Sequence, residues 1–496
     1  MRLFIISLIV CMANVLHAQE ANIFLQRSFW KAKPTVEEIQ QKIKEGHDPA
    51  ESGSHGFDGV SYGIIDDAPL ESIAFMLEQE GNPLEKPTHG GVTYLLWASY
   101  KGNTAVMEHL ISKGANAHMA TSRGTNILSM AAIGGVEDQK VYNLIFAQGV
   151  KVDYENSLGA NALHLLAGSG ADDKAIYTYL AEKGLAWDSK DQDGNGIFNY
   201  AARGGNMEIM KWCVEKGLEY TSLNVKGENA LFFAAYGRKR STIQLETFTY
   251  LEELGLEVDM VNWEGQTPLQ HAIRRADVDV LDFFLERGVN INQIDTDGNT
   301  ALINAAGGKL AILEKVLPLV KDINHKNHKG YSALNMAILR SSTASFDLLL
   351  EHGADVQQVD NRNNNLFYHA FKNFHPKKEK TYAHFIDVLA AKGLNMTDGF
   401  YEGNSLAHIA VEKNSSYLLE KAISLGADIN HKNEIGLSPL HLAAMTATDG
   451  DLINILLKAG ADKRILTEME ESAYELAAEN EMLDKNEVNL SFLKID

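Results

Sequence analysis

Two short segments place aspartates two residues apart just before a glycine, a spacing from which calcium-binding loops are built. They are Asp191-Gln192-Asp193-Gly194 and Asp295-Thr296-Asp297-Gly298. An EF-hand loop takes one ligand from its first residue and a bidentate carboxylate from its last. The first segment has Ser189 and Tyr200 at those places. The second has Gln293 and Asn304. Because no carboxylate closes either loop, we interpret the aspartates as turn residues.

Histidine is common in the chain, with 17 copies, and the densest group is His325-Lys326-Asn327-His328. His431 occupies the same position as His325 in the sequence repeat described below, three repeats later. If each helix layer adds about 10 Å, the two lie roughly 30 Å apart, whereas a zinc–nitrogen bond is about 2 Å long. His325 and His328 have no third ligand nearby in the sequence. We therefore expect no metal site.

Several short catalytic motifs do not occur in the sequence. There is no Gly-x-x-x-x-Gly-Lys-Ser/Thr, no His-Glu-x-x-His and no Cys-x-x-Cys. Catalytic groups also need a pocket screened from water, and no segment outside the repeats is large enough to build one. We expect no enzyme activity and no cofactor. The less favoured alternative is an unrecognised hydrolase or ligand-binding enzyme.

Glycines recur in pairs ten residues apart, which indicates how the chain is built. The first of each pair ends an apolar, helix-like stretch, where a left-handed residue is favoured, and the second precedes the next stretch. Second positions recur every 32 to 40 residues, a period typical of solenoids. Three units keep only one glycine, since Asn363, Glu470 and Val320 replace the other. The complete pairs are Gly46/Gly56, Gly81/Gly91, Gly114/Gly124, Gly149/Gly159, Gly184/Gly194, Gly217/Gly227, Gly255/Gly265, Gly288/Gly298, Gly393/Gly403 and Gly426/Gly436.

A small residue follows each second position by seven residues, with one exception at Leu166, which precedes Ala167. A small side chain at a fixed helix position lets one helix pair pack closely on the next. The series is Gly63, Ala98, Ala131, Ala201, Ala234, Ala272, Ala305, Ala337, Ala370, Ala410, Ala443 and Ala477.

Two segments carry a more specific signature. They are Gly265-Gln266-Thr267-Pro268-Leu269-Gln270-His271-Ala272 and Gly436-Leu437-Ser438-Pro439-Leu440-His441-Leu442-Ala443. They resemble the Gly-x-Thr-Pro-Leu-His-x-Ala motif of ankyrin repeats, and weaker copies cover roughly residues 35 to 480. The resemblance implies an all-α ankyrin-repeat solenoid of about 12–13 helix-pair repeats with short β-turn loops. It also implies that His164, His408 and His441 make local hydrogen bonds, and that the concave face binds other proteins.

The sequence divides into an N-terminal signal peptide and a repeat array with a capping segment at each end. The two longest repeats carry extra residues at 238–240 and 375–380, where we expect extended connections between the first and second helices. The expected segments are a signal peptide (1–18), N-terminal capping helices (19–55), the ankyrin-repeat array (56–469) and a C-terminal capping repeat (470–496).

The N-terminus is typical of a bacterial signal peptide. One basic residue precedes an apolar run, Leu3–Leu16, and a small residue, Ala18, marks the expected cleavage site. A lipid anchor on Cys11 is disfavoured by the bulky residues before it. We expect a periplasmic protein, with secretion as the alternative. Cleavage would leave Cys213 as the one cysteine, so we expect no internal disulfide and a buried, inert thiol.

The net charge of −21 excludes nucleic acid as a favoured partner, because affinity for phosphate backbones depends on Lys and Arg. It favours solubility and a partner with a basic surface, or is the ordinary acidity of an exported protein. We expect no membrane insertion after cleavage, and a monomer.

Aromatic residues on the loop tips are the predicted binding residues, because such side chains dominate interface hot spots. We expect acidic residues to surround them, although some of the rings could instead fold back onto neighbouring repeats. The aromatic set is Tyr154, Trp187, Trp263, Tyr331, Phe400 and Tyr401. The acidic set is Asp193, Glu264 and Asp297, with Glu155.

Together these features predict an exported protein that binds a periplasmic or cell-envelope protein through its concave face, as a scaffold, stabiliser or inhibitor. The alternative is a secreted effector that acts on host or competitor proteins.

Overall fold

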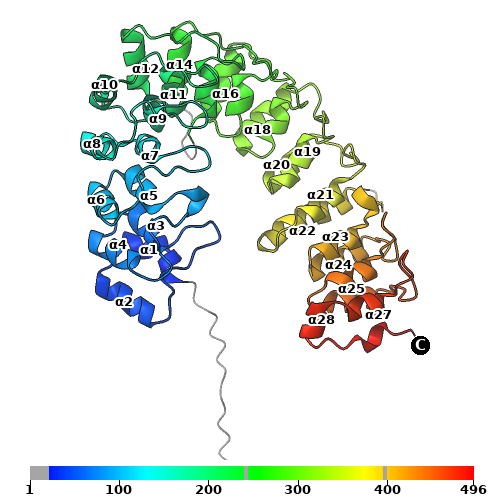
Figure 1. The fold of residues 1–496 in the computed structure, drawn as a ribbon. Helices are drawn as coiled ribbons and strands as arrows, with labels where there is room; N and C mark the ends of the chain where they lie inside the picture. Colours follow the sequence, from blue (N-terminus) through cyan, green and yellow to red (C-terminus); the bar gives the residue numbers. More distant parts are fainter. Residues whose placement is uncertain (1–21, 239–243, 395–398, 496) are drawn as a thin grey trace, which may run out of the picture. The chain divides into compact units, whose positions relative to one another are not determined.

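The computed structural model describes residues 22–238, 244–394 and 399–495, and the regular elements in these ranges are helices (Figure 1). The only β-pairs found there are isolated bridges, such as that between Ala120 and Asn126. The all-α class is therefore confirmed. The predicted signal peptide, residues 1–18, lies outside the described residues. Over the described ranges, no helix is both long and apolar enough to cross a bilayer.

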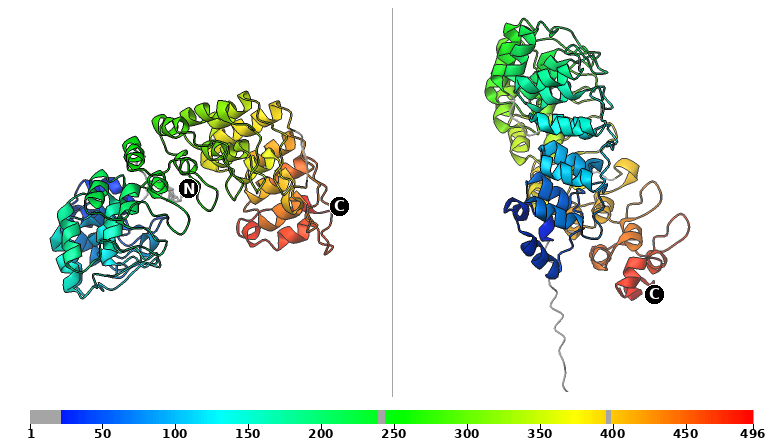
Figure 2. Two further views of the ribbon diagram at one scale, coloured as in Figure 1. Left: turned by 90° about the horizontal axis from the view of Figure 1, so that it is seen from above. Right: turned by 60° about the vertical axis from the view of Figure 1, so that its left-hand side comes forward.

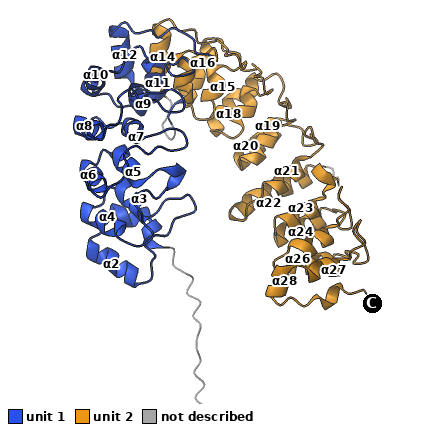
Figure 3. Cartoon of the chain, in the orientation of Figure 1, with its two compact units in different colours: residues 1–225, 237–240 blue, residues 226–236, 241–496 orange. Residues whose placement is uncertain are grey.

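The helices fall into two compact units, coloured separately in Figure 3. The first unit comprises residues 22–225 and 237–238, and the second comprises residues 226–236, 244–394 and 399–495. The first contains α1 (Arg27–Lys31), α2 (Val36–Lys44), α3 (Gly59–Ile65), α4 (Leu70–Leu77), α5 (Tyr94–Lys101), α6 (Thr104–Ser112), α7 (Ile127–Ile133), α8 (Gln139–Ala147), α9 (Ala162–Ser169), α10 (Lys174–Glu182), α11 (Ile197–Gly204) and α12 (Met207–Glu215).

The second unit continues the alternation of first and second helices. Its α-helices are α13 (Ala230–Tyr236), α14 (Leu245–Glu253), α15 (Pro268–Ala272), α16 (Val278–Glu286), α17 (Ala301–Ala305), α18 (Leu310–Val316), α19 (Ala333–Leu339), α20 (Thr343–Glu351), α21 (Leu366–Lys372), α22 (Glu379–Ala391), α23 (Leu406–Glu412), α24 (Ser416–Ser424), α25 (Pro439–Thr446), α26 (Asp451–Lys458), α27 (Ala473–Ala478) and α28 (Glu481–Lys485). Short 3-10 helices are η1 (Ile23–Leu25) and η2 (His89–Gly91) in the first unit, and η3 (Leu317–Leu319), η4 (Pro376–Lys378), η5 (Tyr401–Gly403) and η6 (Leu490–Leu493) in the second.

Within each unit the helices stack side by side (Figure 2). Each odd-numbered helix from α3 is the first helix of a repeat and packs on the first helices before and after it in its own unit. Second helices also pack on one another in several successive repeats, as α4 does on α6 and α24 does on α26. The predicted small residues lie where first helices meet, and all of them are buried. Leu166 is also fully buried, so one larger residue is accommodated in the stack.

The start of each first helix explains the Thr/Ser-Pro-Leu-His motif. Ser438 caps α25 through its hydroxyl, which accepts from the His441 amide, and His441 Nδ1 accepts in return from the Ser438 amide at 3.1 Å. The other ring nitrogen, Nε2, lies 2.9 Å from the Ile465 carbonyl of the following loop. His408 and His164 make equivalent contacts. These histidines therefore fix each helix start and join it to the next repeat, as expected.

The paired glycines have positive φ throughout, as do Asn363 and Glu470 where they replace one. At Gly330 the reason is also steric, because an added Cβ would lie 2.5 Å from the Asn361 backbone nitrogen of the next loop. Val320 is extended, with φ −81°, and the preceding helix ends in η3 instead of a left-handed residue. A missing first glycine therefore changes how that helix ends.

The longer repeat at 375–380 differs from the prediction. We expected an extended connection there, but Pro376–Lys378 forms η4 and Glu379 begins α22. Proline suits the first turn of a helix because its missing amide would have no helical partner there. The extra residues thus lengthen the second helix to 13 residues, against the nine of α20. The other insertion is described only up to Arg238.

Candidate interaction surfaces

On several first helices the residues one before and two or three after the buried small residue remain at least partly exposed, as Trp97 and Tyr100 do beside Ala98. Together with the residue that follows the second glycine of each pair, these positions form what we call the first-helix face. In the first unit they form an apolar row across α3, α5, α7 and α9, named here the aromatic strip. Its members are Phe57, Tyr62, Trp97, Tyr100, Ile133 and Leu165.

The rings of the aromatic strip support one another. Phe57 stacks on Tyr62 with 5.2 Å between ring centroids and lies 5.6 Å from Trp97, and Tyr100 meets Trp97 edge-on at 5.9 Å. The Trp97 indole N–H also donates to Thr88 Oγ1 at 2.8 Å. All four rings remain partly exposed. The strip is therefore an ordered apolar surface whose side chains lose little freedom when covered.

A hollow of about 390 Å³ continues the strip along α7, α9 and α11. Gly168 is part of its lining, while Arg203 and Arg238 bring guanidinium groups to one end. Arg203 has no carboxylate partner among the described residues. The hollow therefore offers a bound segment both apolar contacts and a positive charge. The lining residues are Tyr100, Ile133, Leu165, Gly168, Ser169, Tyr200, Arg203 and Arg238.

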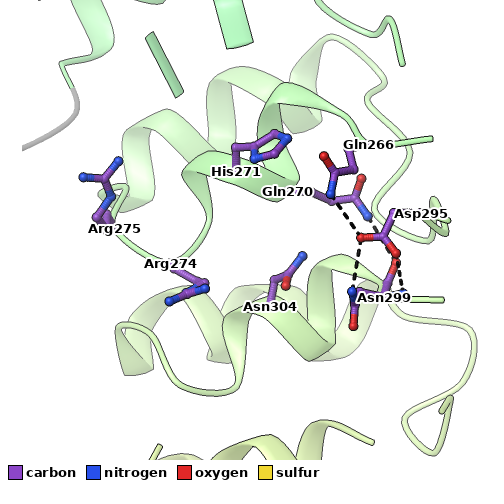
Figure 4. A pocket seen from close by; sticks show the side chains of 8 residues that line it. All are labelled: Gln266, Gln270, His271, Arg274, Arg275, Asp295, Asn299 and Asn304. Atoms are coloured by element: carbon purple, nitrogen blue, oxygen red, sulfur yellow. Dashed lines mark hydrogen bonds between the residues drawn. The ribbon is translucent and has the colours of Figure 1, made fainter. Parts of the chain in front are cut away.

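The first-helix face of the second unit has a different character, shown in Figure 4. A pocket of about 360 Å³ lies beside α15 and α17 and is lined by polar residues. One side is a hydrogen-bonded group around Asp295, which accepts from Gln266 and Asn299 side chains. The other side carries His271, Arg274 and Asn304. The full lining is Gln266, Gln270, His271, Arg274, Arg275, Asp295, Asn299 and Asn304.

Two of the predicted aromatic anchors fold back onto neighbouring repeats. The Tyr154 hydroxyl donates to the Gly124 carbonyl of the preceding loop at 3.0 Å. Trp187 meets Trp212 of α12 edge-on, with ring centroids 4.9 Å apart, and Lys216 Nζ lies 4.5 Å from the Trp187 ring. Both side chains remain partly exposed. Their contacts nevertheless give each ring a structural role within the first unit.

Of three other predicted anchors, two keep more of their surface. Trp263 is 69% exposed and Tyr401 is 40% exposed, with the Arg362 guanidinium 4.4 Å above the Tyr401 ring. Tyr331 is half-buried and meets His369 edge-on at 5.1 Å. Burial is the main reason why the pKa of Tyr331 is raised. These three belong to the second unit but are not brought together in one site.

Phe400 does not lie on the surface, so our expectation of an exposed anchor there is wrong. It is 3% exposed and packs against Tyr368, with ring centroids 5.6 Å apart. The neighbouring Glu402 has a left-handed φ of 62° within η5. In this loop Tyr401, the next residue, is the exposed aromatic side chain.

The predicted acidic residues share one backbone role. The carbonyls of Asp193, Glu264 and Asp297 each accept an amide from the following loop, at 2.8 to 2.9 Å. The Glu264 and Asp297 side chains are exposed, and Asp193 is partly exposed. These residues therefore join successive loops through their backbone, and their carboxylates project from the joined loops.

The aspartates at the calcium-like segments act as turn residues, as interpreted. Asp191 Oδ1 accepts from the amides of Asp193 and Asn195 at 3.0 and 2.8 Å, and Asp295 makes the same pair of bonds. His325 Nε2 lies 2.8 Å from the Gly298 carbonyl. Among the described residues, no group of three or more His, Cys, Asp or Glu side chains could hold a metal ion.

Cys213 lies in α12 and is buried, as predicted. Burial raises the pKa of its thiol to about 12, which keeps the group in the unreactive protonated form at neutral pH.

The aromatic strip was missed by our sequence prediction, which considered the loop tips. A usable signal exists, because aromatic residues occupy the positions beside the small residue in two successive repeats. Tyr62 precedes Gly63, and Trp97 and Tyr100 flank Ala98. Aligning the repeats on the small residue would have placed them on one face.

Comparisons with known proteins agree with this architecture. Models of ankyrin repeats match residues 199–245 and 241–326. The chain is 28% identical over 193 residues to the B-cell lymphoma 3 protein homolog of Mus musculus, covering 38% of this chain and 42% of that protein. It is 25% identical over 278 residues to the nuclear factor NF-kappa-B p105 subunit of Gallus gallus, covering 55% of this chain and 24% of that protein.

Among solved structures, the human ASB11 ankyrin repeat domain has 22% identity and a TM-score of 0.40, covering 47% of this chain and 99% of that domain. The alignments span less than half the length of the two relatives named above. Ankyrin repeats are protein–protein interaction modules, and the chain is a member of the ankyrin-repeat family.

Proposed function

We propose that the chain is exported and binds a protein of the bacterial cell envelope through the aromatic strip of its first unit. It acts as a monomeric scaffold, stabiliser or inhibitor, without catalysis. The observation that supports this most is the strip itself, a row of partly exposed rings on consecutive first helices. Tryptophan and tyrosine are the side chains most enriched in binding hot spots.

The neighbouring hollow indicates what the bound segment carries. Ile133 and Leu165 offer an apolar floor beside Tyr100, and Arg203 lies at the end of the same hollow. A partner segment with apolar side chains followed by a carboxylate would fill the floor and neutralise Arg203. The bound segment inferred here carries a carboxylate, whereas the net charge of the whole chain favours a partner with a basic surface. The two differ because the inference depends on the local surface of the first unit.

The test is capture of envelope proteins by the chain without residues 1–18, with two matched variants. Ile133→Glu places a carboxylate in the strip at a residue that is 39% exposed. Ala147→Glu places the same charge on an exposed position of α8 in the same repeat. We expect Ile133→Glu to abolish capture of a specific protein and Ala147→Glu to retain it. Equal capture by both would exclude the strip as the binding surface.

Export is tested separately by cell fractionation. We expect the mature chain in the periplasm, beginning after Ala18. Recovery from the culture medium would favour the effector alternative, and recovery in the cytoplasm with residues 1–18 intact would contradict export. The motif Leu3–Leu16 followed by Ala18 is the support for this part of the proposal.

A further inference from the structure

The second unit carries a cluster of guanidinium groups on its first-helix face. Arg274 and Arg275 follow α15, and Arg340 follows α19 two repeats later. They occupy the positions two or three residues after the buried small residue. The repeat between them has Gly307 and Gly308 at those positions. We call these five residues the arginine cradle.

The two glycines bring the arginines to either side of a gap. An added Cβ on Gly308 would lie 3.3 Å from the Arg274 Cα, and one on Gly307 would lie 2.8 Å from the Arg340 Cβ. Neither glycine has a positive φ, so the backbone does not require glycine there. The absence of side chains instead leaves room for the Arg340 side chain over Gly307, and Arg274, on the other side, lines the polar pocket.

Two arginines of the cradle, Arg274 and Arg340, are not neutralised by carboxylates in the way that Arg287 is. Arg287 pairs with Glu252 at 2.6 Å, whereas among the described residues neither Arg274 nor Arg340 has an ion pair. Both are exposed. Burial and the charges of Arg340 and Arg275 lower the pKa of Arg274, so the guanidinium groups act on one another. Like charges held together in this way favour a bound anion.

The adjoining pocket adds hydrogen-bonding groups without partners. His271 Nε2 is shielded from solvent and has no hydrogen-bond partner, and Asn304 projects from α17 into the same space (Figure 4). Asp295, the carboxylate in the lining, is 5% exposed and already accepts from the amides of Asp297 and Asn299. Its carboxylate is therefore already occupied by hydrogen bonds within its own turn. Donors remain available at His271, Asn304 and Arg274.

We propose that the arginine cradle and this pocket bind a phosphate group, as the dianion of a phosphate monoester or of inorganic phosphate. A carboxylate has a single charge and would leave most of the cluster uncompensated. A phosphate dianion has two charges and several acceptor oxygens, which match forked guanidinium donors and the neutral donors of His271 and Asn304. The site lies wholly in the second unit and is independent of the aromatic strip.

The binding test uses isothermal titration of the chain lacking residues 1–18 with inorganic phosphate and with phenyl phosphate, at low ionic strength and pH 7.5. We expect saturable binding of both, weakened about tenfold or more by Arg274→Gln or Arg340→Gln, since each removes a charged donor. Gly307→Ala should weaken binding as well, because its Cβ would displace the Arg340 side chain. Arg464→Gln is the matched control, since Arg464 pairs with Asp462 elsewhere in the second unit.

A second arm identifies the source of the phosphate. Vesicles of phosphatidylcholine with and without phosphatidic acid, whose headgroup is a phosphate monoester, are sedimented with the chain. Sedimentation with phosphatidic acid that is lost in Arg340→Gln would assign the site to a lipid headgroup, and binding of free phosphates alone would assign it to a soluble monoester. Absence of binding in both arms, or equal binding by wild type and the three cradle variants with unchanged unfolding, would overturn the proposal.

Discussion

The indole of Trp263 lies against Gly227, the second glycine of the preceding repeat. A Cβ added to Gly227 would lie 2.7 Å from the ring, and the Trp263 amide donates to the Lys226 carbonyl at 2.9 Å. The ring nevertheless remains 69% exposed. One loop tip therefore supports the aromatic residue of the next, and the glycine provides both the turn and the surface on which the ring rests.

Gly227→Ala should destabilise the second unit more than Gly255→Ala. Both glycines have left-handed φ, 74° and 86°, where an alanine costs about 1–2 kcal/mol. Only Gly227 has a ring over its Cα, whereas nothing lies within 4 Å of a Cβ on Gly255. Urea unfolding measures the two losses, and tryptophan fluorescence reports displacement of the indole. Equal losses with unchanged fluorescence would mean that the contact contributes nothing.

Trp187→Ala should lower the free energy of unfolding of the first unit by about 1–3 kcal/mol, because it removes an edge-on ring contact and a cation–π contact. Trp263→Ala should lower the stability of the second unit less, since most of that ring is exposed. Two exposed binding anchors would leave unfolding nearly unchanged when replaced, and the packing of Trp187 on Trp212 is the reason to expect a loss for Trp187. Thermal unfolding followed by circular dichroism compares the two.

The repeats were predictable because their cause is local. Positive φ at the glycines and the burial of residues such as Ala337 depend on contacts that recur in every repeat. The same reasoning extends to His441, whose hydrogen bonds follow from its place at the helix start. A sequence period thus carries direct information about the backbone and the stacking interface.

The surface was less predictable because it depends on where individual side chains turn. Phe400 and Tyr401 are adjacent, yet the first is buried against Tyr368 and the second is exposed. Which of two neighbouring rings turns inward depends on the left-handed Glu402 and on the space beside α21. The arginine cradle likewise joins residues of three repeats, and only the structure brings them to one gap.

Ala98→Leu should destabilise the first unit by about 1–3 kcal/mol, because Ala98 is fully buried where α5 packs on α3 and α7. Ala105→Leu is the matched control, since Ala105 is exposed on α6 of the same repeat. That change should alter the free energy of unfolding by no more than about 0.5 kcal/mol. Denaturant unfolding measures both. A tolerated leucine at position 98 would show that the stack can open at the small residue, as it accommodates Leu166 elsewhere.

The stability of the second unit should fall as the pH is lowered from about 6.5 to about 4, with His408 as one cause. His408 Nδ1 accepts from the Ser405 amide, and Nε2 donates to the Leu437 carbonyl, so protonation would place a second N–H against the Ser405 donor. Burial lowers the pKa of His408 from 6.5 to about 4. The unfolded chain then takes up the proton first, and the shift corresponds to roughly 3 kcal/mol lost by pH 4.

His408→Gln tests this directly, because glutamine occupies the same repeat position at Gln270. There Gln270 Oε1 accepts from the Thr267 amide at 2.8 Å and Nε2 donates to the Gln293 carbonyl at 3.1 Å, and neither group titrates. The variant should therefore keep the fold at neutral pH and lose less stability than wild type between pH 7 and pH 4.5. Urea midpoints across this range measure the difference. Parallel pH profiles would show that the proton is taken up elsewhere, for example at His441, whose pKa burial also lowers.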